Sequence, residues 1–549
     1  MRKTYGYIPN EVDIKAIGGF RDIVDRRAQT CPDVAVFSYC DASTGEKVAV
    51  GPEEFKRQRD ALSVFLHEQG LRRSNIALLG PNSYQWILAQ HAIVASDNVV
   101  AMLPASLEPA SIIDLGVSSN VEAVFASKKL ADVAAKIQEQ VGAKVFCLED
   151  IADYVDEGTA LMARGMTEGA TLELDVNEPA FISYTSGTTG RSKGVVLSQE
   201  NLIANNVLAV QNGRFAGNGV CIVPLSHLLG VGGAQLVSLL SDGTFHINDN
   251  IRYMYRDFAM GNPALLFLVP MIAQSMIDVL WRSIRKSGRE QEVRELIAQN
   301  EERGNVSFEE RRAMFSQDLA IFGTSLDLLV CGGAPVPGEL FDAWAQFGVT
   351  LLQGYGITEC SPVLAVDTYS CVKPGSVGRI IPGEEVKIDR PDSEGIGEIC
   401  VKGPHVMLEY YNMEQATAEA MEDGWFHTGD LGYLDEDLYL FITGRIKNLI
   451  ILSNGENVSP EELEALMGKC PAVQEVVAYE KQDYIAVMVY PNEEIVQSEG
   501  VAEAQRMVRA FVSELNEGLA IFKRIRFVEF RNTPFARTPM KKIKRTDIA

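Results

Sequence analysis

The sequence has no uninterrupted apolar run that is long enough to cross a membrane. A membrane-spanning helix needs about 20 consecutive apolar residues. The best candidate, residues 98–113, is interrupted by Pro104, Glu108 and Pro109. The first residues, MRKTYGYIPNEVD, also lack the apolar centre of a signal peptide. We therefore expect a cytoplasmic protein with no membrane contact beyond weak peripheral binding.

Positive charge and paired cysteines are scarce as well. Lys and Arg number 50 against 74 Asp and Glu, so the formal net charge is -24. Such a surface repels polyphosphate backbones at long range, which argues against nucleic acid as a partner. The nine cysteines show no paired metal-ligand spacing, which indicates a reducing compartment with buried thiols.

The chain contains no internal repeat and no low-complexity segment. Its 549 residues, with 46% hydrophobic and 23% charged side chains, are typical of a globular enzyme with two or more domains. Up to about Gly444, short β-branched runs alternate with helical stretches, which predicts an α/β region with parallel and mixed sheets. Past Arg445 the runs shorten and a helix opens at Ser459. We predict a large N-terminal region of several subdomains over 1–445 and a small α+β lid domain over 446–549.

A segment rich in glycine and hydroxyl groups, YTSGTTGRSKG at positions 184–194, follows a strand-like run. Its backbone N–H groups and hydroxyls can cradle phosphate, and its lysine adds positive charge. The spacing is not that of a Walker loop, because no Gly-Lys pair stands at the required distance. A flexible surface turn is the alternative. The residues assigned to this cradle are Thr185, Ser186, Gly187, Thr188, Thr189, Gly190 and Lys193.

Two further segments could hold the rest of a nucleotide. LLVCGGAP at 328–335 is typical of a strand that ends in a Gly-Gly turn, where a flat ring can approach the backbone closely. GYGITEC at 354–360 offers an aromatic ring for adenine, then a hydroxyl and a carboxylate that suit a Mg²⁺ ion bridging phosphate oxygens. The residues concerned are Gly333, Ala334, Pro335, Gly354, Tyr355, Gly356, Thr358 and Glu359.

A carboxylate and a guanidinium stand close to the predicted domain boundary. WFHTGD at 425–430 ends in Asp430, and YLFITGR at 439–445 ends in Arg445. A carboxylate can accept hydrogen bonds from two ribose hydroxyls, and a guanidinium suits a ribose or a phosphate. Either residue by itself could equally be structural.

In this order, the segments resemble signatures of the adenylate-forming superfamily, which includes acyl-CoA synthetases, luciferases and peptide-synthetase adenylation domains. The resemblance covers most of the chain and implies the fold of that superfamily. RTPMKKIKR at 537–545 resembles the last signature and aligns Lys542 with the catalytic lysine, although Ala536 replaces a usual proline and Lys541 a usual glycine. Register alone separates Lys542 from Lys541 and Lys544. Without the resemblance, this run is a basic tail that could contact anionic lipid.

The resemblance implies a reaction with ATP, Mg²⁺ and CoA. A substrate carboxylate attacks the α-phosphorus of ATP and expels pyrophosphate, and a thiol then takes the acyl group while AMP leaves. Catalytic roles fall to Lys542, Glu359 and Thr185, with Glu359 as the metal ligand. Between the two steps the lid rotates about Lys447, and Gly455 permits close passage of a pantetheine arm.

The acid is suggested by three weaker features. His227, in PLSHLLG, is the candidate gate of the acyl pocket, and a simply packed histidine is the alternative. Residues 221–237 contain no acidic side chain to pair with an α-amine, which disfavours an amino acid as substrate. A charged helical excursion on the surface at 281–315 resembles an insert of long-chain fatty acyl-CoA synthetases. We therefore expect medium- or long-chain fatty acids.

Other functions stay open from the sequence alone. An aryl or bile-type acid CoA ligase, or a donor of acyl groups to a carrier protein, would use the same chemistry. A catalytically silent nucleotide-binding scaffold would keep only the fold. The sequence does not determine the chain length or ring type of the acid, the acceptor thiol or the oligomeric state.

Overall fold

The computed structural model divides the chain into two compact units. Unit 1 consists of Met1–Glu385 with Lys402–Phe426, and unit 2 consists of Val386–Val401 with His427–Ala549. Unit 2 thus includes residues that precede Arg445, and the domain boundary predicted at that residue stays a prediction. The described residues are 17–185, 192–212, 215–369, 372–453 and 456–537, with Ile543 and Arg545.

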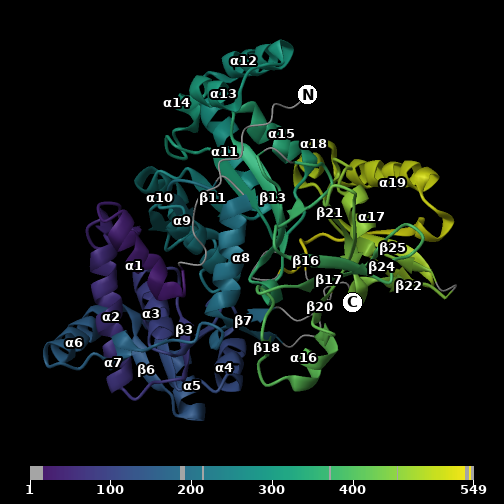
Figure 1. Cartoon of the computed structure of the whole chain (residues 1–549). Helices are drawn as coiled ribbons and strands as arrows, with labels where there is room; N and C mark the ends of the chain where they lie inside the picture. The colour runs from purple at the N-terminus through teal and green to yellow at the C-terminus, as the bar shows by residue number, and fades with distance from the viewer. Residues whose placement is uncertain are drawn as a thin grey trace. The chain divides into compact units, whose positions relative to one another are not determined.

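Unit 1 contains a seven-stranded sheet in the order β18-β8-β7-β4-β3-β5-β6 (Figure 1). The strands from β7 to β6 in this order are parallel, and the antiparallel strands β8 and β18 close one edge. Apolar side chains of the sheet pack against helices α4 (Pro109–Ser118) and α5 (Ala131–Val141). The strand bounds are β3 (Asn75–Leu79), β4 (Val99–Met102), β5 (Ala123–Ala126), β6 (Lys144–Cys147), β7 (Pro179–Thr185), β8 (Lys193–Ser198) and β18 (Glu409–Tyr410).

A second, nine-stranded sheet of unit 1 has the order β15-β14-β13-β12-β11-β9-β10-β1-β2. Its central strands are parallel, and antiparallel pairs stand at both edges. Two mixed sheets in one α/β unit confirm the predicted fold class. The strand bounds are β1 (Phe37–Cys40), β2 (Lys47–Val50), β9 (Gly219–Cys221), β10 (Phe245–Ile247), β11 (Leu265–Leu268), β12 (Leu328–Cys331), β13 (Thr350–Gly356), β14 (Val363–Val366) and β15 (Arg379–Ile380).

Helix starts in unit 1 follow local sequence signals. The side chain of Ser83 accepts a hydrogen bond from the Trp86 N–H at the start of α3, and proline occupies the first turn of α2, α4 and α11. The bounds of most helices in this unit are α1 (Phe20–Thr30), α2 (Pro52–Glu68), α3 (Tyr84–Ala95), α6 (Ile151–Ala163), α7 (Glu168–Thr171), α8 (Gln199–Asn212), α9 (Val237–Leu240), α10 (Met254–Gly261), α14 (Ser316–Leu319), α15 (Gly338–Gln346) and α16 (Glu414–Ala420).

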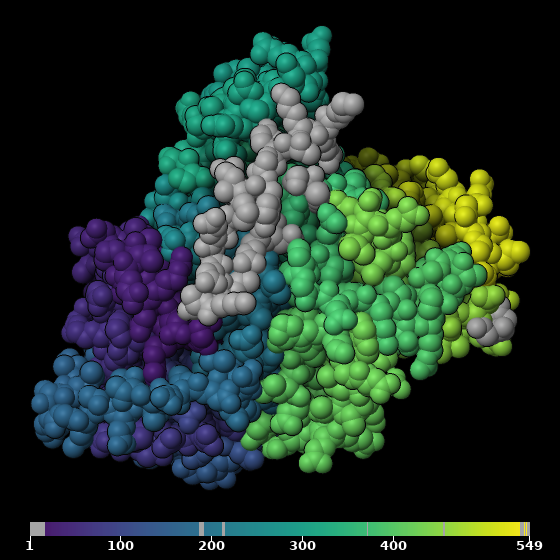
Figure 2. All heavy atoms as spheres, in the orientation of Figure 1, coloured from purple at the N-terminus to yellow at the C-terminus, as the bar shows by residue number. Residues whose placement is uncertain are grey.

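The charged excursion predicted at 281–315 is helical but not merely solvated. It runs through α11 (Pro270–Lys286), α12 (Glu290–Arg303) and α13 (Phe308–Met314), whose teal spheres lie at the top of Figure 2. Val293 and Phe315 are fully buried and join the hydrophobic core around Trp344. The helical excursion predicted on the surface is present, and an apolar stripe under its charged face fixes the helices to unit 1.

Unit 2 combines strands and helices in the way predicted for a small α+β domain. A three-stranded sheet in the order β24-β25-β26 packs against α17 and α19 around a core that includes Leu463, Val487 and Val508. Elsewhere in the unit β17 neighbours β20, and β20 pairs with β21. The bounds are β16 (Glu385–Asp389), β17 (Gly397–Lys402), β20 (Trp425–Leu434), β21 (Leu440–Arg445), β22 (Ile450–Ile451), β23 (Asn457–Val458), α17 (Pro460–Met467), β24 (Val473–Lys481), β25 (Tyr484–Pro491), α18 (Glu493–Glu499), α19 (Val501–Gly518) and β26 (Ile525–Phe530).

Two expectations about the whole chain can be compared with the described residues. No helix among them has the length and apolar character required to cross a membrane. Of the eight cysteines they include, five are buried, but Cys31, Cys40 and Cys147 are only half-buried. The prediction of buried thiols is wrong for these three. Cys31 follows α1, Cys40 ends β1, and Cys147 ends the edge strand β6.

We expect Phe315→Ala to destabilise unit 1 strongly, because the ring is fully buried and its loss leaves a cavity under the excursion. The expected loss is about 3–5 kcal/mol in the free energy of unfolding, measured by urea titration. Phe308→Ala is the matched control, since that ring is 37% exposed, and it should change stability by less than about 0.5 kcal/mol. Equal effects of both variants would contradict the packing described.

Candidate active site

The predicted phosphate cradle stands between two antiparallel strands of unit 1. β7 and β8 run antiparallel, and Thr185 on β7 pairs directly with Lys193 on β8. These two residues therefore hold both ends of the intervening loop at the carboxyl edge of the parallel strands, where ligands of open α/β sheets bind. The predicted cradle residues Ser186, Gly187, Thr188, Thr189 and Gly190 lie outside the described residues.

Lys193 and Glu359 are brought together through a tyrosine. The Lys193 Nζ atom lies 4.1 Å from the centroid of the Tyr410 ring, a cation–π contact. The Tyr410 hydroxyl donates a hydrogen bond of 2.8 Å to Glu359 Oε1. Burial, followed by the charge of Glu359, raises the pKa of Tyr410, so the phenol stays protonated and can donate. Three distant segments therefore meet beside the hairpin.

Tyr410 is a site residue that sequence reasoning missed. It stands on β18, which pairs with β8 so that Tyr410 faces Val195, and the next tyrosine donates its backbone N–H to Gly194. No local signal distinguishes this tyrosine from a structural one. Only the pairing of β18 with β8 reveals its place.

Glu359 has the chemistry that a Mg²⁺ ion requires. It lies half-buried on the short 3₁₀ helix η6 (Thr358–Cys360), and its backbone oxygen accepts a hydrogen bond of 2.8 Å from the Met407 N–H. A fixed, ionisable carboxylate is the hard oxygen ligand that Mg²⁺ prefers. The residues at this position therefore fit the ion, and Thr358 begins the same turn.

The two glycine-containing segments predicted to hold adenine include the ends of two adjacent strands, β12 and β13. Cys331 on β12 pairs with Gln353 on β13, so the turn with Gly333, Ala334 and Pro335 starts beside Gly354. Gly333 has φ +81°, in the left-handed region that favours glycine.

The end of β13 admits only glycine at one position. A Cβ atom on Gly356 would lie 1.8 Å from the carbonyl oxygen of Pro362. Between the glycines Tyr355 is half-buried. The ring of Tyr355 therefore stands at the end of β13, between two glycines. Its role as a support for adenine stays a prediction.

Asp430 and Arg445 form a cross-strand pair within unit 2. They face each other on β20 and β21, and Arg445 Nε donates to Asp430 Oδ1 at 2.7 Å. The Asp430 side chain is 3% exposed and that of Arg445 43% exposed, so one partner is buried while the other reaches solvent. Lys447 follows in the short 3₁₀ helix η7 (Ile446–Asn448) and is exposed. Their ribose, phosphate and hinge roles stay predictions.

His227 lies in unit 1 just before an uncommon helix. The half-buried ring precedes the π-helix η4 (Leu229–Leu236), a geometry that often marks functional sites. Its Nε2 atom is buried and has no hydrogen-bond partner among the described residues. Burial lowers the pKa of His227 to about 4, so the ring is neutral at physiological pH. The role of this imidazole as a gate stays a prediction.

Lys542, together with Lys541, Lys544 and the predicted channel residue Gly455, lies outside the described residues. The nearest described neighbours are anchored in unit 2: Arg537 pairs with Ile543, and the guanidinium of Arg545 reaches Glu461 and Glu464. The choice among the three lysines stays a prediction.

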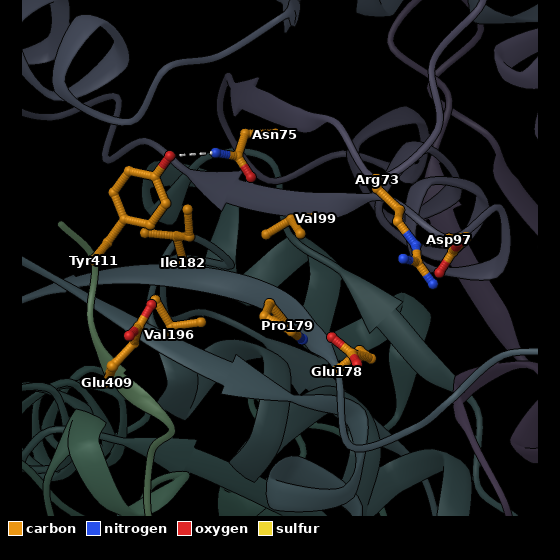
Figure 3. A pocket seen from close by; sticks show the side chains of 10 residues that line it. All are labelled: Arg73, Asn75, Asp97, Val99, Glu178, Pro179, Ile182, Val196, Glu409 and Tyr411. Carbon is orange, nitrogen blue, oxygen red and sulfur yellow. Dashed lines mark hydrogen bonds and ion pairs between the residues drawn. The ribbon is translucent and has the colours of Figure 1, made fainter.

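A pocket of about 330 Å³ in unit 1 is separate from these residues (Figure 3). It opens at the amino ends of parallel strands, whereas Thr185 stands at a carboxyl end. Inside it the side-chain amide of Asn75 donates to the Tyr411 hydroxyl at 2.9 Å. The lining residues are Arg73, Asn75, Asp97, Val99, Glu178, Pro179, Ile182, Val196, Glu409 and Tyr411.

The β7–β8 hairpin, the acidic turn at Glu359 and the glycine-ended strand β13 stand at carboxyl edges of the sheets of unit 1, where open α/β folds bind ligands. The sequence profile of the AMP-binding enzyme family matches residues 24–411, and that of the AMP-binding enzyme C-terminal domain matches 447–549. The chain therefore belongs to the AMP-binding enzyme family. It is an AMP-forming acid–CoA ligase, with ATP and CoA as co-substrates.

Curated relatives differ in the acids that their names give. A long-chain-fatty-acid–CoA ligase of Mycobacterium tuberculosis is 28% identical over 75% of this chain and 72% of its own. The 4-coumarate–CoA ligase 1 of Arabidopsis thaliana is 27% identical over 99% and 93%. Feruloyl-CoA synthase of an Amycolatopsis species is 32% identical over 56% and 57%.

Solved structures share the fold. ATP-bound MatB from Rhodopseudomonas palustris has a TM-score of 0.75 and 23% identity, over 96% of this chain and 98% of that chain. The O-succinylbenzoate CoA synthetase of Bacillus subtilis, in complex with ATP and magnesium ion, has a TM-score of 0.73 and 21% identity over 96% and 98%. The predicted adenylate-forming fold is thus confirmed.

We expect Tyr410→Phe to impair the reaction with ATP while it preserves the ring beside Lys193. The variant removes the hydroxyl that orients Glu359, and a hydrogen bond to a charged group corresponds to about a 10- to 100-fold loss in kcat/KM for ATP. Pyrophosphate release at varied ATP concentrations measures this loss. Tyr411→Phe, which alters the neighbouring ring in the pocket, should cost less than about threefold; a similar loss in both would contradict the assignment.

We expect His227→Leu to flatten the pH dependence of stability. The pKa of His227 is about 4 in the folded protein against an ordinary 6.5. The unfolded chain therefore binds more protons between these values, and stability falls as the pH drops from about 6.5 towards 4. Urea titrations at about pH 7 and about pH 5 should differ by about 1–2 kcal/mol less in the variant. An unchanged difference would show that the ring titrates normally.

Proposed function

We propose that the chain activates medium- or long-chain fatty acids and transfers them to CoA. The observation that carries the activation step is the meeting of Lys193, Tyr410 and Glu359 beside the β7–β8 hairpin. A cation, a fixed phenol and a carboxylate at the base of a glycine-rich turn form a site for a metal-bound triphosphate. A silent scaffold would have no need of this arrangement.

The first half-reaction needs positioning and charge neutralisation rather than a protein nucleophile. The substrate carboxylate attacks the α-phosphorus of ATP, and pyrophosphate leaves with its electrons. In our proposal Thr185 and Lys193 hold the phosphates, and Tyr355 supports the adenine. Glu359 would hold a Mg²⁺ ion, which supplies Lewis-acid neutralisation of the phosphate oxygens when bound.

In the second half-reaction the thiol of CoA attacks the acyl carbonyl, and AMP leaves. We propose that Asp430 and Arg445 contact the ribose, because their cross-strand pair presents the guanidinium to solvent. Lys542 would neutralise the α-phosphate during the first step and withdraw before the second. The lid over 446–549 would turn about Lys447, and the backbone at Gly455 would admit the pantetheine arm.

The preference for a fatty acid has chemical support from the segment around His227. The π-helix η4 buries Val231, Ala234 and Leu236, and no carboxylate in 221–237 could pair with an amine. A long-chain-fatty-acid–CoA ligase is among the relatives. An aryl acid is the second candidate, because 4-coumarate and feruloyl ligases are relatives too.

A location in the cytoplasm and weak peripheral binding to anionic lipid are part of the proposal. The basic run at 537–545 provides the positive charge for such binding. A chain with a net charge of -24 would otherwise be repelled from an anionic surface.

The decisive measurement is pyrophosphate release with ATP and Mg²⁺ across a panel of acids, from acetate to oleate together with aryl and bile acids, each with and without CoA. We expect the highest kcat/KM with medium- or long-chain fatty acids, a higher rate with CoA, and a loss of at least about 100-fold in Lys542→Ala. Lys541→Ala and Lys544→Ala are matched controls, because they remove the same charge from neighbouring positions.

Each other outcome points to a different function. If kcat/KM were highest with cinnamic or bile acids, the substrate would be such an acid rather than a fatty acid. A rate of pyrophosphate release that does not change with CoA would indicate a carrier-protein thiol as acceptor. ATP binding without turnover on any acid would refute the ligase and favour the scaffold. A loss of activity in Lys541→Ala alone would move the catalytic role to that residue.

A further inference from the structure

Three side chains with metal-binding atoms converge in unit 2, and none of them has a role in the proposed reaction. Glu398 and Cys400 alternate on β17, so both side chains leave the same face of the strand. His427 stands on the neighbouring strand β20 and faces them. Its Nδ1 atom lies 2.9 Å from Glu398 Oε2 and 3.4 Å from Cys400 Sγ.

The 3.4 Å between His427 Nδ1 and Cys400 Sγ already matches an edge of a small coordination sphere. Tetrahedral zinc binds thiolate sulfur at about 2.3 Å and imidazole nitrogen or carboxylate oxygen at about 2.0 Å, which sets neighbouring ligand atoms about 3.3–3.6 Å apart. In the protein all three candidate atoms lie within 4.8 Å of one another. Small side-chain rotations would therefore bring them to bonding distance, without any movement of the strands.

The surroundings hold the three ligands in place. The Gly429 N–H donates to Glu398 Oε1 at 2.9 Å, which leaves the other oxygen of the carboxylate directed at His427. The Thr428 hydroxyl donates to the Ile399 carbonyl at 2.8 Å and ties the two strands together. Such hydrogen bonds to metal ligands fix their orientation and tune affinity.

The three candidate ligands differ in how far they are buried. Cys400 is fully buried, whereas the side chains of Glu398 and His427 are 20% and 15% exposed. An ion can therefore approach past the carboxylate and the imidazole, with water completing the fourth position. A buried thiol beside a mostly buried imidazole and carboxylate suits a borderline-soft ion better than Mg²⁺ or Ca²⁺.

We propose that Glu398, Cys400 and His427 bind a thiophilic divalent cation, for which Zn²⁺ is the best chemical match. On binding, the Cys400 thiol releases one proton to solvent and the thiolate bonds to the ion. His427 binds through Nδ1 and keeps its proton on Nε2. The cation joins β17 to β20 within unit 2.

Cobalt absorption tests the site directly. The full-length protein is titrated with Co²⁺, whose thiolate complexes give a charge-transfer band that carboxylate or imidazole ligation alone does not produce. We expect about one equivalent of Co²⁺ to saturate this band, and Zn²⁺ to abolish it by displacement. Cys400→Ser should lose the band, and His427→Gln should weaken Co²⁺ binding by at least about tenfold.

Cys147→Ser is the matched control. Cys147 is half-buried and its thiol lies 3.4 Å from a Glu149 oxygen, but the described residues place no histidine with it in a metal-binding group. This variant should keep the full band. Because His427→Gln alters a half-buried side chain, it tests the site even if Cys400→Ser does not fold.

Several results would overturn the proposal. They are the absence of a charge-transfer band in the unmodified protein, an undiminished band in Cys400→Ser, or unchanged affinity in His427→Gln. A band lost in Cys147→Ser would place the metal at β6 instead. Thermal unfolding with added Zn²⁺ gives an independent readout: the midpoint should rise for the unmodified protein and Cys147→Ser, but not for folded Cys400→Ser.

Discussion

The antiparallel return of β8 along β7 is the constraint on which the site of unit 1 depends. Because Thr185 pairs with Lys193, the two ends of the glycine-rich turn are fixed by a sheet rather than by the turn itself. β18 then pairs with β8 and carries Tyr410 to the lysine, and the tyrosine hydroxyl reaches Glu359. A shift of one residue in this register would send the side chains to the opposite face. The chemistry of the site therefore relies on strand register.

Much of this architecture could be predicted from the sequence, because the informative residues stand where strands end. Apolar runs followed by glycine predicted parallel strands with open turns, and the structure places Gly333 in the turn after β12, next to Gly354 on the adjacent strand β13. The composition of the excursion at 281–315 was misleading, because charged residues outnumber the apolar stripe that includes Phe315 and fixes it to the core. Charge counts do not show which face of a helix is buried.

What the sequence could not reveal are contacts made by strand pairing between distant segments. Tyr410 resembles any tyrosine until β18 is placed beside β8. Cys400 and His427 have none of the close spacing that marks a metal motif, yet neighbouring strands bring them within 3.4 Å. In the same way, Asp430 and Arg445 form a pair because β20 and β21 are in register.

The hairpin also determines which electrostatic forces can act on a bound nucleotide. In many phosphate sites the loop leads straight into a helix, whose dipole attracts the anion. Here β8 intervenes, and α8 begins only at Gln199, roughly 20 Å of extended chain beyond the turn. A helix dipole acts only within its first turn, so it contributes nothing at that distance. At the proposed phosphate site, attraction would therefore come from side-chain cations such as Lys193, and ionic strength, which screens point charges near a surface, would regulate nucleotide affinity.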